Sequence, residues 1–445
     1  MIPVEDAVRV ELEAIMTSGL QGFPLPTADE KANFKWRGIS VMNARNILRI
    51  SAGALLAIAI FTAPAVAQKK YDPGATDTEI KIGNIMPYTG LFSEYGAIGR
   101  AEAAYFQMIN DRGGVNGRKI NFVSVDSGSD ARKSVELAHK LVEQDEVLLT
   151  VSTWGTSTNK AIRPYMNEKK VPQLFVASGA ATFDDPSHYP WTMGFHATYR
   201  TEGSVYAKYI LRSMPDARIA VLYSDDEEGR DWLLGVHDGL GEKASTMIVK
   251  EVSFEYTDPK TIDPRIVALK SSGADVFIDM AVGKFATQAI RKAYDIGWHP
   301  LQFIPNASIS ISALLDPAGL KKAVGIISNA RSKGWSMPQL ERDPAVREFL
   351  AWMRKYNPDA NVRDANTVAG YEVAQTLVEV LKKCGDELTR ENVMKQATSL
   401  DFEIGMLRPG IRVRTSPTNY RPIRQLYLIK FNGKHWEPLG EVIGD

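Results

Sequence analysis

The chain contains a single cysteine, Cys384, among its 445 residues, so no disulfide bond can form within it. Its six histidines are scattered and lack the spacing of metal ligands. Cys-x-x-Cys pairs, His-Glu-x-x-His zinc motifs and Gly-x-Ser-x-Gly nucleophile elbows are also missing. The sequence therefore predicts no metal, no cofactor and no catalytic residue, and it favours a binding protein over an enzyme.

An excess of charge of one sign is absent as well. Lysine and arginine together number 53, and aspartate and glutamate together also number 53. This balance does not favour binding to nucleic acid or to an anionic membrane surface. The 24% of charged and 44% of hydrophobic residues are ordinary for a globular protein. We expect a soluble protein that has no nucleic-acid partner.

The apolar run from Ile50 to Phe61 is too short to span a bilayer, because spanning takes roughly 20 residues. Arg45 and Arg49 precede this run, and the small residues Ala65-Val66-Ala67 follow it. This order is typical of a secretory signal peptide that is cleaved after the small residues. We therefore predict a signal peptide at residues 42–67 and an exported, periplasmic protein. A transmembrane anchor and a buried core helix are the alternatives.

Residues 1–41 precede the predicted signal peptide and show little periodicity. Met42 stands directly before the basic region, so we interpret residues 1–41 as the product of a start codon assigned too early. A genuine long leader or a cytoplasmic tail is the alternative. Without residues 1–67 the chain has 378 residues, which is more than one hydrophobic core usually serves, and two domains are expected.

Short β-branched runs alternate with longer helical patterns along most of the remaining chain. A strand pattern at 80–85, for example, is followed by a helical pattern at 99–110. Such alternation predicts an α/β fold in which parallel sheets are covered by helices on both faces. Further strand patterns at 411–414, 425–431 and 436–439 indicate that the chain returns at its end to complete an earlier domain.

Several short motifs occur in a characteristic order. Ile80-Lys81-Ile82-Gly83 precedes Met86-Pro87-Tyr88-Thr89-Gly90, and the stretch from Ile109 to Arg118 (INDRGGVNGR) follows them. Ser178-Gly179-Ala180 then comes after Val171-Pro172-Gln173-Leu174. In this order and spacing the motifs resemble those of the leucine/isoleucine/valine-binding proteins of bacterial ABC importers. The resemblance runs from about Ile80 to the C-terminal strands.

The resemblance implies the periplasmic binding protein type I fold: two Rossmann-like lobes with parallel central sheets, joined by three hinge crossovers around a cleft that closes on its ligand. The first lobe would comprise residues 75–196 and 329–416, and the second residues 197–328 and 417–445. The implied function is to capture a small carboxylated solute, of the branched-chain amino-acid type, and to deliver it to an inner-membrane ABC permease with its ATPase. We expect a monomer.

Carried over from the family, the carboxylate-binding residues are Thr156, Ala180 and Thr182. Thr156 lies between a predicted strand and the helix that follows it, where free N–H groups and the positive end of the helix dipole attract an anion. Thr182 would add a hydroxyl and Ala180 its backbone groups. The alternative is that the two threonines only cap helices.

Three aromatic residues are predicted to line the same cleft. Tyr95 aligns with an aromatic lining residue of the family, and Trp154 and Phe92 would add apolar wall. A purely structural role in the hydrophobic core is the alternative for these side chains.

The second lobe departs from the family pattern. Glu228 replaces a tyrosine, and the position of the acid that pairs with an amino acid's ammonium falls near Asn306 and Ala307, which carry no charge. Glu228 or Asp279 could supply the missing acid. If neither does, aromatic or aliphatic organic acids become the expected ligands. Glu228 could also belong to a solvated acidic loop.

Two other functions remain open at this point. One is a ligand-sensing receptor domain of the same fold, and the other is an exported enzyme. The enzyme would need a nucleophile and a base, and no such pair is recognisable.

Overall fold

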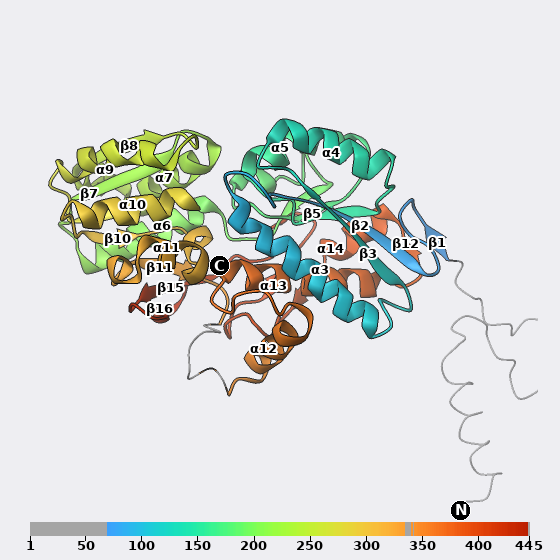
Figure 1. Cartoon of the computed structure of the whole chain (residues 1–445). Coiled ribbons are helices and arrows are strands. Elements are labelled where there is room, and N and C mark those ends of the chain that lie inside the picture. Colours follow the sequence, from blue (N-terminus) through green and yellow to red (C-terminus); the bar gives the residue numbers. More distant parts are fainter. Residues whose placement is uncertain (1–68, 334–339, 341, 444–445) are drawn as a thin grey trace, which may run out of the picture. The chain divides into compact units, whose positions relative to one another are not determined.

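The computed structural model describes residues 69–333, 340 and 342–443 (Figure 1). The predicted leader at residues 1–41 and the predicted signal peptide at residues 42–67 lie outside the described residues. Among the described helices, none has the length and apolarity needed to cross a membrane.

The first lobe is built on a five-stranded sheet in which all strands are parallel, in the order β3-β2-β4-β5-β6. Helices α4 and α5 cover one side of this sheet and α3 covers the other (Figure 1). The elements are β2 Glu79–Met86, α3 Gly96–Asp111, β3 Lys119–Asp126, α4 Ala131–Glu143, β4 Leu149–Val151, α5 Thr156–Glu168, β5 Gln173–Val176 and β6 Thr192–Gly194.

The second lobe is built on a seven-stranded sheet in the order β16-β15-β11-β10-β9-β7-β8. The five strands from β8 to β11 are parallel, and β15 and β16 are antiparallel additions at one edge. The elements of this lobe up to β11 are α6 Tyr199–Ser213, β7 Ile219–Ser224, α7 Glu227–Leu240, α8 Ala244–Met247, β8 Ile248–Phe254, α9 Asp263–Lys270, β9 Val276–Asp279, α10 Lys284–Asp295, β10 Leu301–Phe303, α11 Asp316–Ala318 and β11 Ile327–Ala330.

After β11 the chain returns to the first lobe, where α13 packs along α3. Gly370 of α13 permits this close approach, because a Cβ atom there would lie 2.4 Å from the carbonyl oxygen of Ile98. The remaining elements are β1 Lys70–Tyr71, α12 Pro344–Tyr356, α13 Ala365–Cys384, β12 Glu387–Leu388, α14 Arg390–Ala397, β13 Asp401–Phe402, β14 Val413–Arg414, β15 Leu426–Phe431 and β16 Trp436–Ile443.

The chain thus passes between the two sheets three times: after β6, after β11 and before β15. The predicted α/β fold with parallel central sheets is confirmed. Strand β11 reaches Ala330, two residues past the lobe boundary expected at 328, so the division into residue ranges remains a prediction.

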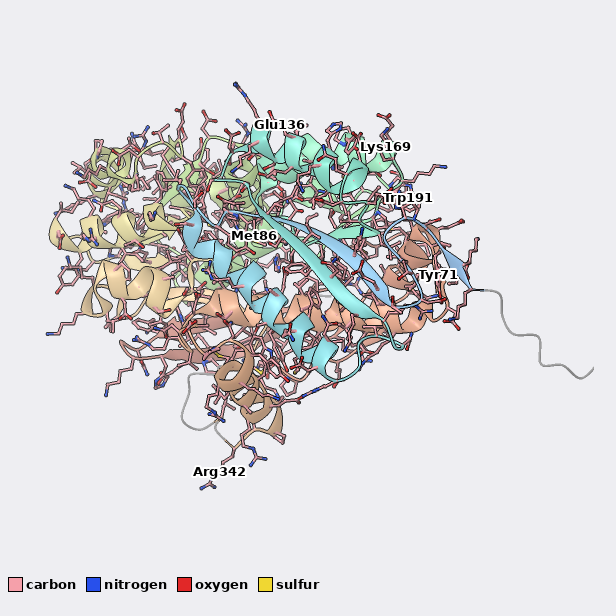
Figure 2. All side chains as sticks on the ribbon, turned by 45° about the vertical axis from the view of Figure 1, so that its right-hand side comes forward. Tyr71, Met86, Glu136, Lys169, Trp191 and Arg342 are labelled. Atoms are coloured by element: carbon pink, nitrogen blue, oxygen red, sulfur yellow. The ribbon has the colours of Figure 1, made fainter. Side chains whose placement is uncertain are left out.

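Both faces of each sheet are apolar. On one side of the first sheet, Ile85 of β2 is buried together with Leu141 of α4 and Ile162 of α5, and a larger cluster that includes Phe106 and Leu377 fills the other side. Charged residues such as Glu136 and Lys169 lie on the outer surface, whereas Met86, at the end of β2, is fully buried (Figure 2).

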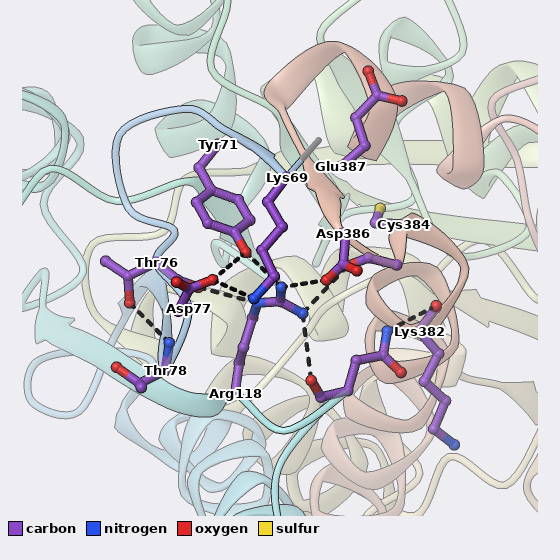
Figure 3. Close-up of polar contacts among 12 residues, drawn as sticks. Lys69, Tyr71, Thr76, Asp77, Thr78, Arg118, Lys382, Cys384, Asp386 and Glu387 are labelled. Carbon is purple, nitrogen blue, oxygen red and sulfur yellow. Dashed lines mark hydrogen bonds and ion pairs between the residues drawn. The ribbon is translucent and has the colours of Figure 1, made fainter. Parts of the chain in front are cut away.

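A buried arginine fixes the start of the described chain to the end of α13 (Figure 3). Arg118, which is 2% exposed, donates to the carbonyl oxygen of Thr76 (3.0 Å), the hydroxyl of Tyr71 (2.6 Å) and Oδ1 of Asp386 (2.6 Å). Strand β1 also pairs with β12, in parallel. Segments more than 300 residues apart in the sequence are therefore held together.

The helices differ in how their first turns are capped. Helices α4, α7 and α12 begin at aspartates whose side chains accept from backbone N–H groups. Helices α5 and α10 begin at Gly155 (φ 95°) and Gly283 (φ 59°) and have no side-chain cap. The first N–H groups of α5 are consequently available to an acceptor from outside the helix.

Candidate binding site

A cavity of about 120 Å³ lies where the two lobes and the crossover segments meet. This volume exceeds that needed for a single water molecule, roughly 10–15 Å³ on the same measure. The first lobe lines it with Tyr95, Trp154, Gly155, Ser178 and Gly179, the second lobe with Glu228, Val282, Asn306 and Ala307, and the crossovers with His196, Arg331 and Gln425.

Thr156 is the first residue of α5 and lies next to the lining residue Gly155. Its Oγ1 atom is 2.8 Å from Oγ of Ser178 and donates a hydrogen bond to Oε2 of Glu228 over 3.1 Å. A chain of polar groups therefore joins the first lobe to the second at the uncapped start of α5. Hydroxyls at a helix N-terminus suit an anionic or strongly polar acceptor.

None of the three predicted carboxylate-binding residues is among the residues that line the cavity, although Thr156 adjoins the lining residue Gly155. Thr182 lies in the short helix Ala181–Phe183, where its Oγ1 and carbonyl oxygens accept from Nη1 of Arg163 at 3.1 and 2.7 Å. Neither Thr182 nor the buried Ala180 is among the residues that line the cavity. Ser178, which sequence reasoning missed as a site residue, lines it instead and receives the N–H of Ala180 (3.2 Å).

Glu228, the second residue of α7, lines the cavity and faces Thr156. Burial, and next the charge of nearby Asp226, raise the pKa of Glu228 to about 8, although hydrogen bonds from Thr156 and Tyr199 act in the opposite direction. Its carboxyl group can therefore be neutral near pH 7, when it can donate a hydrogen bond, or ionised at higher pH, when it can accept from an ammonium.

Two further contacts from the same helix reach the first lobe. Oδ2 of Asp231 accepts from the backbone N–H of Ala181 (2.8 Å), and Glu227 forms an ion pair with Lys160. Together with Glu228, these residues place one turn of α7 against the start of α5 and the loop after β5.

The predicted aromatic residues form one wall. The rings of Tyr95 and Trp154 stack with centroids 4.9 Å apart, and Phe92 packs behind Trp154 at 5.0 Å. The hydroxyl of Tyr95 donates to the carbonyl of Ala307 (3.1 Å) and accepts from the N–H of Gly283 (3.0 Å), so it crosses between the lobes. Tyr95 and Trp154 line the cavity, whereas Phe92 supports them from outside it.

The two candidates for the missing acid differ in position. Asp279 is 0% exposed within β9, accepts from the N–H of Ala281 and from Gln302 at 3.1 Å each, and is not among the lining residues. Burial raises the pKa of Asp279 to about 8. Glu228 is thus the only one of the pair that the structure brings to the cavity.

Another acid, Glu202, lines the cavity and was not recognised from the sequence. It accepts from the N–H of Asn306 (2.6 Å), the hydroxyl of Tyr206 (2.8 Å), Nε1 of Trp232 (2.9 Å) and Nδ2 of Asn329. With these donors in place, Glu202 holds the loop after β10 and the end of β11 in position. The sequence signal was absent because Glu202 lies within an ordinary amphipathic helical pattern.

Comparison with known proteins agrees with this architecture. A family model described as periplasmic binding protein matches residues 79–435. Leu/Ile/Val-binding protein homolog 1 of Brucella abortus (strain 2308) is 26% identical over 343 residues, covering 75% of this chain and 86% of that protein. The sequence resemblance stated above is confirmed.

Two solved structures share the fold. One is a branched-chain amino-acid ABC transporter protein from Thermus thermophilus with bound valine (TM-score 0.73, 17% identity, covering 84% of this chain and 97% of that one). The other is a solute-binding protein of an ABC transporter from R. palustris in complex with 4-hydroxybenzoate (TM-score 0.70, 19% identity, covering 82% and 97%). The chain belongs to the periplasmic binding protein family, whose members bind solutes rather than catalyse reactions.

Proposed function

We propose that this chain captures a small carboxylated solute in the cavity between its lobes and delivers it to an ABC permease. The observation that carries the proposal is the pair of hydroxyls, Thr156 and Ser178, at the uncapped start of α5 beside the cavity. Such a helix end favours a carboxylate, which can accept from hydroxyls and backbone N–H groups at once.

A branched-chain amino acid is the first candidate for this solute. The relatives named for leucine, isoleucine and valine support it, as does the valine-bound structure with the same fold. In this mode the solute carboxylate meets the Thr156–Ser178 pair, and an ionised Glu228 pairs with the ammonium, because Asn306 and Ala307 provide no charge.

An aromatic or aliphatic organic acid is the second candidate. The stacked rings of Tyr95 and Trp154 favour a flat apolar body, and the structure with 4-hydroxybenzoate supports this class. In this mode Glu228 is neutral and donates to the solute carboxylate, so that two negative charges do not meet.

The proposed place of action is the periplasm, where the protein acts as a monomer with an inner-membrane permease and its ATPase. The family is periplasmic, and the small residues before Gln68 provide a cleavage site for export. N-terminal sequencing of protein from the periplasmic fraction should find a start at or near Gln68. An intact Met1 or Met42 in that fraction would contradict this part of the proposal.

The binding proposal is tested by calorimetric titration of the purified protein with amino acids, aromatic acids and short aliphatic acids. At least one acid should bind, and Thr156→Val should weaken it by about 10–100-fold, because a hydrogen bond to a charged group is typically worth about 1.5–3 kcal/mol.

Thr182→Val is the matched control, since the hydroxyl of Thr182 accepts from Arg163 and takes no part in the contacts that Thr156 makes with Ser178 and Glu228. It should leave affinity within about 3-fold of the wild type. Equal affinity in wild type and Thr156→Val, at unchanged melting temperature, would remove the start of α5 from the site.

A further inference from the structure

The first crossover segment brings a histidine to the cavity. His196 lies two residues after the end of β6, and it lines the cavity. Its Nδ1 atom is buried, yet it has no hydrogen-bond partner among the described residues. An unpaired buried polar atom carries a desolvation cost, so a group that binds there is favoured.

Arg331, which follows β11, lines the same part of the cavity. Its Nε donates to Oε2 of Glu372 (2.9 Å), and its guanidinium lies 5.6 Å from the ring of Phe195, which in turn lies 5.5 Å from the ring of His196. No hydrogen bond joins the two terminal amino groups of Arg331 to another described residue. The arginine is anchored through one nitrogen and has further donors to offer.

The charges of the side chains around His196 and Arg331 favour an uncharged group of the solute at this place. Glu372 is fully buried and already balances the charge of Arg331, so a second carboxylate here would bring an uncompensated charge. Burial, and next the charge of Arg331, hold the pKa of His196 well below its usual value, so its imidazole is neutral. A neutral imidazole offers one donor and one acceptor.

We propose that His196 and Arg331 form a second polar subsite, which binds a hydroxyl group of the solute. A hydroxyl accepts from Arg331 and donates to His196, which satisfies both without adding charge. The inference rests on the proposed function: the solute carboxylate lies by Thr156 and Ser178, and the hydroxyl lies elsewhere on the same molecule. The solute class is therefore a hydroxy-carboxylic acid whose hydroxyl is separate from the acid group.

The test uses pairs of acids that differ by one hydroxyl: benzoate and 4-hydroxybenzoate, phenylalanine and tyrosine, butyrate and 4-hydroxybutyrate. Dissociation constants are measured by calorimetry for the full protein and its variants. In any pair that binds, the hydroxylated member should bind the wild type at least about 10-fold more tightly, since a site built for a hydroxyl rejects the analogue that lacks it.

His196→Phe keeps an aromatic ring but removes both nitrogens, and it should reduce the preference within a pair to about 3-fold or less. His196→Gln provides a hydrogen-bond donor and an acceptor, and it should recover part of the preference for the hydroxylated acid. The control His188→Phe changes an exposed histidine, 76% of whose side chain is accessible, and should keep the full preference. Because Arg331→Met alone would leave Glu372 unpaired, Arg331→Met is combined with Glu372→Gln, and this double variant should also lose the preference.

If His196→Phe fails to fold, as judged by its melting temperature, the double variant and His196→Gln decide the matter. A wild type that binds both members of a pair equally overturns the inference and leaves the proposed function standing. A preference that persists in His196→Phe or in the double variant also overturns it. If no acid binds the wild type, the proposed function fails and this inference fails with it.

Discussion

The hydroxyl of Thr156 donates a hydrogen bond to Oε2 of Glu228 over 3.1 Å, and so joins the start of α5 in the first lobe to the start of α7 in the second. The protein's own carboxyl group thus lies beside the hydroxyl proposed to hold the solute carboxylate. The carboxylate of a bound solute would therefore lie close to the carboxyl group of Glu228. Whether the two groups attract or repel each other depends on the protonation state of Glu228.

The first prediction concerns how the affinity for the solute depends on pH. Because the pKa of Glu228 is raised to about 8, a simple organic acid should bind more weakly as the pH rises through about 8, when two carboxylates would meet. An α-amino acid should instead bind more tightly over the same range while its ammonium stays charged. Titration calorimetry between pH 6.5 and 9 shows whether the affinity rises or falls with pH. In the Glu228→Gln variant the affinity should no longer depend on pH in this range. If the pH dependence remains, a group other than Glu228 controls it.

The second prediction concerns closure of the lobes. Asp231→Ala removes the acceptor for the N–H of Ala181 and should weaken solute binding by about 3–10-fold. Lys160→Ala breaks only the half-exposed ion pair with Glu227, and such pairs contribute about 0–1 kcal/mol, so its effect should be smaller. Calorimetry measures both, and small-angle scattering reports the extent of closure. The reverse order of effects would place the main contact at Lys160.

The third prediction separates stability from binding. Arg118→Met should lower the free energy of unfolding by about 2–4 kcal/mol, because Tyr71, Asp386 and the carbonyl of Thr76 lose their buried partner. Solute affinity should stay within about 2-fold, since Arg118 does not line the cavity. Urea unfolding provides the measurement, and Arg132→Met, at an exposed site on α4, is the control. A large loss of affinity at unchanged stability would contradict this account.

The fourth prediction concerns pH and stability. Glu102 and Asp279 are both 0% exposed, and burial raises the pKa of each to about 8. Between about pH 5 and 8 the folded protein keeps protons on these carboxyl groups that the unfolded chain releases. Stability should therefore fall as the pH rises through this window. Melting temperatures from pH 5 to 8 test this, and Glu102→Gln should flatten the slope; an identical slope would exclude Glu102 as a cause.

Much of the fold could be predicted because its signal is local. The helical pattern at 99–110 corresponds to α3 (Gly96–Asp111), and the strand pattern at 425–431 to β15 (Leu426–Phe431). Periodicity records which side chains face a core, so it gives the element type well and the ends only to within a few residues. The strand pattern expected at 411–414 corresponds to the shorter β14 (Val413–Arg414), which pairs with the two-residue β13.

The candidate site, too, could be predicted only where the signal is local in the sequence. The sequence alone indicated the family, the position of Thr156 before a helix and the aromatic residues near it, because motifs and helix starts are properties of neighbouring residues. It could not show that Arg163 engages Thr182, or that Asp279 is enclosed within β9. Those outcomes depend on which distant side chains the packed sheets place nearby.

Glu228, His196 and Arg331 show the part that only the tertiary structure decided. They belong to α7 and to two different crossovers, and they share a cavity because the chain passes between its sheets three times. Sequence patterns specify which face of each element is apolar. Hydrogen bonding, burial and charge balance within the cavity follow from the arrangement of these elements in space, since each of those energies depends on distances between residues far apart in the chain.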